Sequence, residues 1–233
     1  MCGRYTITDS RRVAEAFELD AIEADLSRPR YNIAPTQAVP AVLVRDGRRV
    51  LADLHWGLVP SWAKDRTIGA RLINARAETL ASKPSFRSAF AQRRCLIVAD
   101  GFYEWARRGA AKQPMYIRVD GGMPFAFAGL FDRWRPETPE ALASCTIITT
   151  EPNALLKSIH DRMPVILPRE AYAAWLDPAQ ADPAALAALL KPFDADRMTA
   201  QPVSHHVNSP RHDDEQCIAA IDSLFDSGSW LRR

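Results

Sequence analysis

Short apolar runs separated by turn residues dominate the chain and predict a structure rich in β-strands. Residues 38–45 and 48–58 are strand-like runs on either side of Asp46-Gly47, a strong signal for a β-hairpin. The continuously apolar residues 95–99 predict a buried strand. Further strands are predicted at residues 102–105, 114–119, 124–131, 144–150, 165–167 and 198–204.

Helical patterns lie between these strands without the regular alternation that is typical of parallel sheets. Asp9 or Ser10 can cap a short helix in which Val13 and Phe17 share one face. Two prolines predict an irregular stretch at residues 28–36. Other helical segments are predicted at residues 73–79, 85–92, 152–159, 168–176 and 183–190.

Together these elements predict one α+β domain that covers residues 1–233. Its sheet is expected to be antiparallel or mixed and to curl toward a barrel. Residues from about 209 onward are expected to form a polar tail. The histidines of this region, His205, His206 and His212, are interpreted as surface residues.

Composition and charge narrow the functional classes only modestly. Hydrophobic residues make up 47% of the chain and charged residues 25%, as in ordinary globular proteins, and the net charge of +2 identifies no partner. Four cysteines lie far apart without a C-x-x-C pair, which argues against a zinc cluster or a disulfide framework and for a reducing compartment. His55 has no ligand-spaced partner, so neither a metal site nor a cofactor is predicted. Without an apolar run of membrane-spanning length or a secretory leader, we expect a cytoplasmic protein with no membrane partner.

The most reactive candidate is Cys2, which becomes the first residue if Met1 is removed. It then carries an α-amine with a pKa near about 8 and a neighbouring thiol with a pKa near about 8.5. Such an aminothiol condenses with an aldehyde and closes a five-membered thiazolidine ring. Alternatively, the thiol attacks an acyl group with its own amine as the base. A third interpretation is an ordinary small residue in a fraying terminus.

Three further residues are candidates for acid–base or orienting roles. Glu104, in a predicted strand, either faces solvent or lies in a pocket where lost hydration favours its protonated form. His160 either interacts with the carbonyls at a helix end or donates a proton to a leaving oxygen. Asn74 either caps a helix or orients a reacting group.

Arginines and an aromatic side chain lie near these candidates. Arg4, Arg76 and Arg162 are close to them in sequence, and Trp62 lies in a loop rich in aromatic residues. They are either scattered surface residues or the lining of a groove for single-stranded DNA, in which charge contacts phosphates and rings stack on bases.

Seven motifs in order give the chain a distinctive resemblance. They are Met-Cys-Gly-Arg-Tyr at 1–5, Tyr-Asn-Ile-Ala-Pro-Thr at 31–36, Trp-Gly-Leu-Val-Pro-Ser-Trp at 56–62, Ile-Asn-Ala-Arg-Ala-Glu-Thr at 73–79, Asp-Gly-Phe-Tyr-Glu-Trp at 100–105, Ile-His-Asp-Arg-Met-Pro at 159–164 and Pro-Val-Ser…Val-Asn at 202–208. In these motifs the chain resembles the SRAP family, the SOS response-associated peptidases, also described as sensors of abasic sites in single-stranded DNA.

The resemblance implies a single domain with a curled pseudo-barrel sheet, peripheral helices and a positively charged DNA groove. Met1 would be removed by self-processing, and Cys2 would trap the aldehyde of an abasic site as a thiazolidine DNA–protein crosslink. The reactive group would comprise Cys2, Asn74, Glu104 and His160. The implied DNA-binding positions are Arg4, Asn32, Trp62, Arg76, Thr149, Thr150 and Arg162. The protein is expected to act as a monomer, near the nucleoid during DNA repair.

Two other functions remain open at this point. One is an N-terminal-nucleophile peptidase or hydrolase that acts on peptide or amide bonds, although no glutamine-binding pattern is recognisable. The other is a noncovalent binder of single-stranded DNA that uses only charge and stacking.

Overall fold

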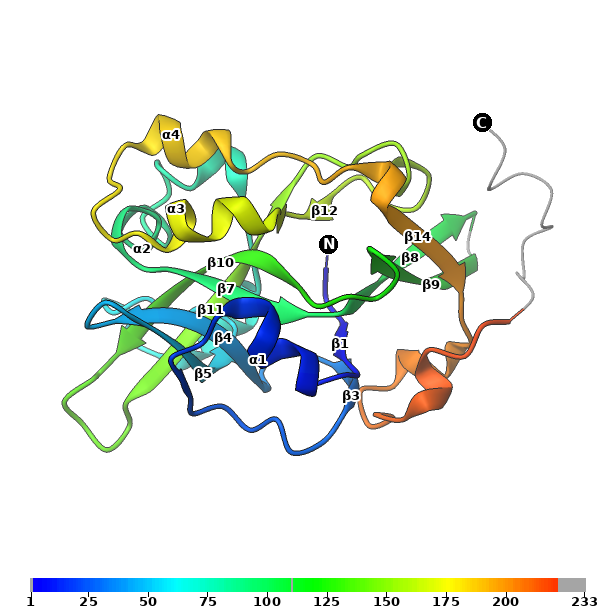
Figure 1. Cartoon of the computed structure of the whole chain (residues 1–233), viewed down its shortest axis with the longest axis horizontal. Coiled ribbons are helices and arrows are strands. Elements are labelled where there is room, and N and C mark those ends of the chain that lie inside the picture. The colour runs from blue at the N-terminus through cyan, green and yellow to red at the C-terminus, as the bar shows by residue number, and fades with distance from the viewer. Residues whose placement is uncertain (1, 110, 222–233) are drawn as a thin grey trace.

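Five strands pair in a closed ring at the centre of the structure (Figure 1). In this computed structural model, which describes residues 2–109 and 111–221, the ring runs β4-β5-β11-β10-β7 and back to β4. Its members are β4 (Ala38–Arg45), β5 (Arg48–Trp56), β7 (Arg94–Ala99), β10 (Phe125–Trp134) and β11 (Leu142–Thr150). Within this ring only β5 and β11 pair in parallel. The predicted α+β fold with a mixed, curled sheet is therefore confirmed.

A second sheet of five strands adjoins the ring, to the right in Figure 1. Its order is β14 (Met198–Pro202), β9 (Ala111–Val119), β8 (Gly101–Arg108), β1 (Tyr5–Ile7) and β3 (Arg30–Ile33), and neighbouring strands are antiparallel. Four short strands extend the first sheet: β2 (Ala21–Ile22), β6 (Asn74–Arg76), β12 (Met163–Pro164) and β13 (Ile166–Leu167).

The turn between β7 and β8 joins the two sheets. The buried carboxylate of Asp100 accepts hydrogen bonds from the hydroxyl groups of Thr6 (2.6 Å) and Thr8 (2.7 Å), which fasten the end of β1 to this turn. A side chain at Gly101 would clash with the ring of Tyr116, so only glycine fits there.

The helices are short and lie outside the strands (Figure 1). The α-helices are α1 (Arg11–Phe17), α2 (Arg87–Gln92), α3 (Tyr172–Leu176) and α4 (Pro183–Ala188). The 3-10 turns are η1 (Arg66–Arg71), η2 (Ala77–Thr79), η3 (Leu156–Ser158), η4 (Arg169–Ala171), η5 (Ala195–Arg197), η6 (His205–Asn208) and η7 (Glu215–Cys217). No helix within the described residues combines the length and apolarity needed to cross a membrane.

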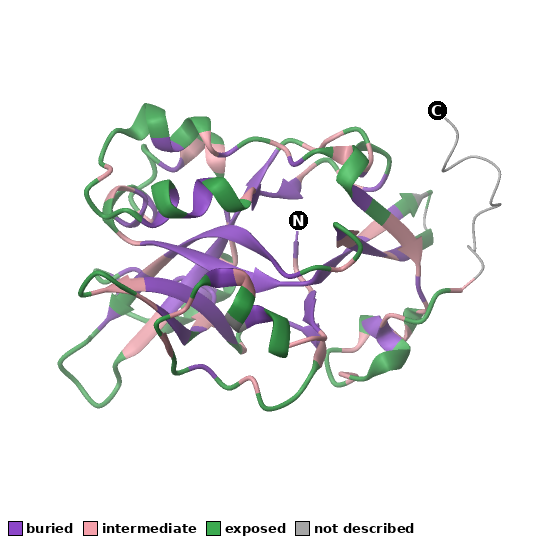
Figure 2. Ribbon diagram, viewed as in Figure 1, coloured by how far each residue is buried: buried purple, intermediate pink, exposed green. Residues whose placement is uncertain are grey.

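The core lies within the ring and beneath the helices, as the purple strands of Figure 2 show. Tyr5 is fully buried in it, with its ring centroid 5.4 Å from that of Trp56 and 5.8 Å from that of Phe127. Aromatic burial of this kind holds the beginning of the chain firmly against the ring of strands.

Four local predictions need correction, each because of contacts with distant parts of the chain. Residues 73–79 are not helical at their start, since Asn74–Arg76 pairs in parallel with β11. Residues 28–36 contain the strand β3, which the two prolines flank rather than interrupt. Only Leu156–Ser158 of the helix expected at 152–159 forms a 3-10 turn. Residues 209–221 are not a polar tail: Cys217 is fully buried, and Asp213 accepts hydrogen bonds from two backbone N–H groups of β3. Residues 222–233 of the expected tail lie outside the described residues.

Candidate active site

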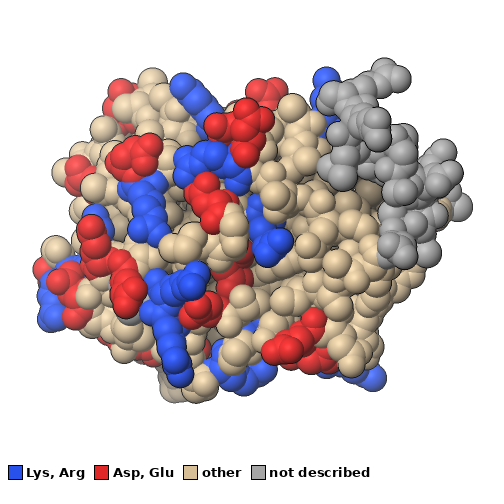
Figure 3. Space-filling model, turned by 45° about the vertical axis from the view of Figure 1, so that its right-hand side comes forward, with Lys and Arg blue, Asp and Glu red and all other residues tan. Residues whose placement is uncertain are grey.

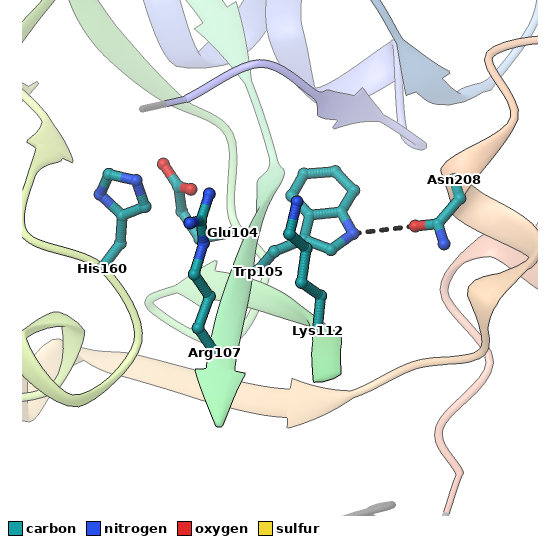
Figure 4. Close-up of a pocket in the computed structure, with 6 residues that line it drawn as sticks. All are labelled: Glu104, Trp105, Arg107, Lys112, His160 and Asn208. Atoms are coloured by element: carbon teal, nitrogen blue, oxygen red, sulfur yellow. Dashed lines mark hydrogen bonds between the residues drawn. The ribbon is translucent and has the colours of Figure 1, made fainter. Parts of the chain in front are cut away.

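The pairing of β1 with β8 places the start of the chain beside Glu104. Tyr5 lies opposite Phe102, and the N–H of Tyr103 donates to the carbonyl of Arg4 (3.0 Å). Continuing this antiparallel register brings the residues before Arg4 alongside those after Tyr103. In Figure 4 the chain that leads into β1 runs past the carboxylate of Glu104.

Cys2 is held in a closed environment. Its side chain is fully buried, its Sγ lies 4.0 Å from the carbonyl oxygen of Arg4, and its own carbonyl accepts a hydrogen bond from Asn74 Nδ2 (2.9 Å). Burial, aided by the nearby negative charge of Glu104, raises the pKa of the Cys2 thiol well above its ordinary value. The resting thiol is therefore protonated at neutral pH.

Glu104 has the properties of a proton carrier. Its side chain is 2% exposed, and burial, with a contribution from the charge of Asp161, raises its pKa to about 7. Both protonation states are then populated at neutral pH, which suits a group that takes up and returns a proton.

His160 follows η3 and lies in the same pocket. Its Nδ1 is 3.0 Å from the N–H of Arg162 and 2.8 Å from a carboxylate oxygen of Asp161, and it cannot accept from one and donate to the other at once. Because burial lowers the pKa of His160, we assign the neutral ring, in which Nδ1 accepts from Arg162 and Nε2 carries the proton.

Glu104 and His160 open onto a pocket of about 400 Å³ (Figure 4). Its lining residues are Glu104, Trp105, Arg107, Lys112, His160 and Asn208. The indole N–H of Trp105 donates to Asn208 Oδ1 (2.8 Å) and holds the ring at the edge of the pocket. An adjoining hollow of about 680 Å³ shares Arg107 and His160 with it and adds Lys157.

The structure thus gathers Cys2, Asn74, Glu104 and His160 from distant parts of the chain. It also adds four lining residues that sequence analysis did not select. Trp105 and Asn208 lie inside two of the seven motifs, so the sequence contained a signal that could have identified them. Arg107 and Lys112 face each other across the β8–β9 pair, and only the strand register reveals their proximity to Glu104.

Five of the seven expected DNA-binding residues are bonded or buried within the protein, and the other two are exposed. Arg4 and Asn32 are bonded to each other (3.0 Å) and to the backbone around Val207, and Asn32 is 1% exposed. Arg162 pairs with both carboxylate oxygens of Glu78 and with the carbonyl of Thr149. Thr149 and Thr150 are buried, whereas Arg76 is exposed and Trp62 is 58% exposed.

Basic side chains on the face shown in Figure 3 are interspersed with acidic ones. This agrees with the ion pairs that engage many arginines, such as Arg28 with Asp213 and Arg197 with Asp120. The face drawn in Figure 3 is therefore not uniformly basic, whereas Arg107 and Lys112 place positive charge at the pocket.

Comparisons with known proteins agree with the arrangement of the motifs. The family model described as SOS response associated peptidase (SRAP) matches residues 1–210. Abasic site processing protein YoqW of Bacillus subtilis is 46% identical over 221 residues, which cover 94% of this chain and 99% of that protein. Abasic site processing protein HMCES of Gallus gallus is 35% identical over 227 residues, which cover 84% of this chain and 67% of that protein. A crystal structure of a protein from Bacteroides thetaiotaomicron superposes with a TM-score of 0.85 at 30% identity, covering 94% of this chain and 100% of that one. The chain belongs to the SRAP family.

Proposed function

We propose that this protein binds abasic sites in single-stranded DNA and forms a thiazolidine crosslink through Cys2 after Met1 is removed. The observation that carries the proposal is a chain of contacts: Asn74 binds the carbonyl of Cys2, the charge of Glu104 acts on the Cys2 thiol, and Glu104 lines one pocket with His160. The names of YoqW and HMCES, abasic site processing proteins, give independent support.

The chemistry begins with the sugar of the lesion. An abasic deoxyribose is an aldehyde in equilibrium with a closed ring, and ring opening needs a proton at the ring oxygen. The Nε2–H of the neutral His160 ring donates a hydrogen bond to this oxygen as the C1–O bond breaks, and the proton that the C1 hydroxyl group loses ends on the former ring oxygen.

Crosslinking then follows in two bond-forming steps. The Cys2 amine adds to the aldehyde carbon, and loss of one water leaves an imine. The Cys2 sulfur adds to the imine carbon while the thiol proton passes to the nitrogen, which closes the thiazolidine. The overall reaction releases one water molecule and involves no oxidation or reduction.

Glu104 carries protons between these steps. Because the pKa of the buried thiol is raised, the thiol stays protonated until a base removes its proton. Because the pKa of Glu104 is about 7, its carboxylate is present at neutral pH; it accepts the thiol proton as the sulfur bonds to the imine carbon and passes that proton to the nitrogen. Asn74 orients Cys2 through the bond to its carbonyl, and its Oδ1, without a hydrogen-bond partner among the described residues, offers an acceptor for the freed amine.

Self-processing is the peptidase step in this proposal: water hydrolyses the Met1–Cys2 amide and releases methionine.

DNA is held by charge and stacking without reading of bases, because the lesion has none. Arg76, Arg107 and Lys112 supply exposed charge, and Trp62 supplies an exposed ring. The walls against which the DNA rests are shaped by residues that are bonded or buried within the protein: Arg4, Asn32, Thr149, Thr150 and Arg162.

The test is crosslinking of the protein lacking Met1 to an abasic single-stranded oligonucleotide. We expect an adduct stable to denaturation, which Cys2→Ala abolishes. Cys2→Ser provides the matched control: like Cys2→Ala it keeps the amine but lacks the sulfur, so both variants form only an imine, which borohydride traps. An undiminished stable adduct with Cys2→Ala would reject the assignment, and repeated turnover of a peptide or glutamine would favour an N-terminal-nucleophile hydrolase.

A further inference from the structure

Three side chains of types that bind metal ions meet in the segment after β14. His206 lies on η6, Asp214 caps η7 by accepting from the N–H of Gln216, and Cys217 ends η7. Their ligand atoms all lie within 4.8 Å of one another. We propose that His206, Asp214 and Cys217 bind a zinc ion, with water as the fourth ligand. This inference is independent of the function proposed above.

The donor set selects zinc over the common alkaline-earth ions. A thiolate and an imidazole suit zinc, whereas calcium and magnesium prefer oxygen ligands throughout. Ligands about 2.0–2.3 Å from a tetrahedral zinc lie about 3.3–3.7 Å from one another. His206 Nε2 is 3.1 and 3.2 Å from the two carboxylate oxygens of Asp214, so this pair is already close to the required spacing. The thiol sulfur lies within 4.8 Å of the other two ligand atoms, so a shift of about 1 Å brings it to the required spacing.

The ligands are also held in place by their neighbours. The ring of His212 stacks on that of His206, with centroids 3.8 Å apart, and its Nδ1 bonds to the carbonyl of His206 (2.7 Å). The N–H of Cys217 donates to the carbonyl of Asp214 (3.0 Å). Cys217 is buried while the side chain of Asp214 is 53% exposed, so water reaches the fourth position from the open side. Binding converts the thiol to a thiolate and releases its proton to solvent.

The location gives the ion a structural role. The residues that follow His206 contact the pocket wall: Arg4 donates to the carbonyls of Val207 and Asn208, and Asn208 holds Trp105. A zinc ion that joins η6 to η7 would brace this wall from outside, at a distance in sequence from the reactive group.

Cobalt provides the spectroscopic test, because a thiolate bound to Co²⁺ gives a charge-transfer absorption. The full chain is used in a Cys2→Ala background, since a free N-terminal aminothiol binds metal itself. We expect this absorption to saturate at one equivalent of Co²⁺ and to disappear when Zn²⁺ displaces it. Cys217→Ser should abolish it, and His206→Ala should weaken the affinity for Co²⁺ more than about tenfold.

The matched control is His205→Ala, an exposed histidine next to the site that should bind Co²⁺ like the parent. Should Cys217→Ser fail to fold, Asp214→Asn serves, because it keeps the thiol and should still weaken Co²⁺ binding at least about tenfold. Absence of the absorption at one equivalent, or its survival unchanged in the ligand variants, would overturn the proposal.

Discussion

The carboxyl group of Glu104 is 2% exposed, and burial raises its pKa to about 7. The folded protein therefore binds a proton at Glu104 more tightly than the unfolded chain does. Stability from the protonated group is fully present below the unfolded pKa, near about 4.3, and is lost as the pH rises to about 7. Above that pH, the active carboxylate lowers the free energy of unfolding.

Glu104→Gln should consequently separate stability from activity. The variant lacks a buried charge, so its free energy of unfolding at pH 8 should exceed that of the parent by up to about 3 kcal/mol, with little difference at pH 4. Its crosslinking rate at pH 7 should fall roughly 100-fold, because the proton carrier is gone. Denaturant unfolding and adduct formation over time measure the two effects.

The matched control is Glu15→Gln, an exposed glutamate on α1, which should change neither quantity appreciably. If Glu104→Gln forms the crosslink at the parental rate, the proton-carrier role is wrong. If its stability gain is the same at pH 4 and pH 8, the raised pKa is not the cause.

At the scale of elements, Asn32 connects β3 to η6 and to the segment that follows η6. Its Nδ2 is within bonding distance of the carbonyls of Val207 (3.1 Å), Ser209 (2.9 Å) and His212 (2.8 Å), and the group is almost fully buried. Removing this amide leaves buried acceptors without their donor, which costs more than the loss of a solvated hydrogen bond.

Asn32→Ala should therefore lower the free energy of unfolding by about 2–3 kcal/mol. Asn208→Ala is the control, since it removes an exposed asparagine of the same segment and should cost about 0.5 kcal/mol or less. Denaturant titration compares them. Equal costs for the two variants would show that the Asn32 contacts do not stabilise this junction.

Local patterns predicted the elements that depend on local signals, such as the hairpin at Asp46-Gly47 and the buried strand at 95–99. They failed where a distant strand decides the conformation: Asn74–Arg76 is extended because β11 lies beside it. Cys217 is buried by contacts with a segment far earlier in the chain. The hydrophobic periodicity of the sequence does not predict these contacts. The candidate site likewise came from the order of motifs, because the contact between Asn74 and the carbonyl of Cys2 spans 72 positions.

For the molecule as a whole, the balance of charge limits how DNA can be held. The net charge is +2, and arginines on the described surface are often paired with acids. We therefore expect noncovalent binding to use a small set of exposed cations, such as Arg76, Arg107 and Lys112, rather than a broad basic surface.

For the Cys2→Ala variant, a plot of the logarithm of the binding constant for single-stranded DNA against the logarithm of the salt concentration should have a slope of about −2. This is the slope expected for about three phosphate contacts. Arg107→Ala should reduce the magnitude of that slope by about 0.7, whereas Arg11→Ala, an exposed arginine on α1, should leave it unchanged. Fluorescence anisotropy over a range of salt concentrations measures both. The same change for both variants would mean that the pocket does not contact the phosphates.

The intact mass of the protein after reaction with an abasic oligonucleotide tests the central claim most directly. We predict a single adduct whose mass equals the chain without Met1 plus the oligonucleotide, less one water. A protein that retains Met1 and still forms the adduct, or an adduct without loss of water, would contradict thiazolidine formation at Cys2.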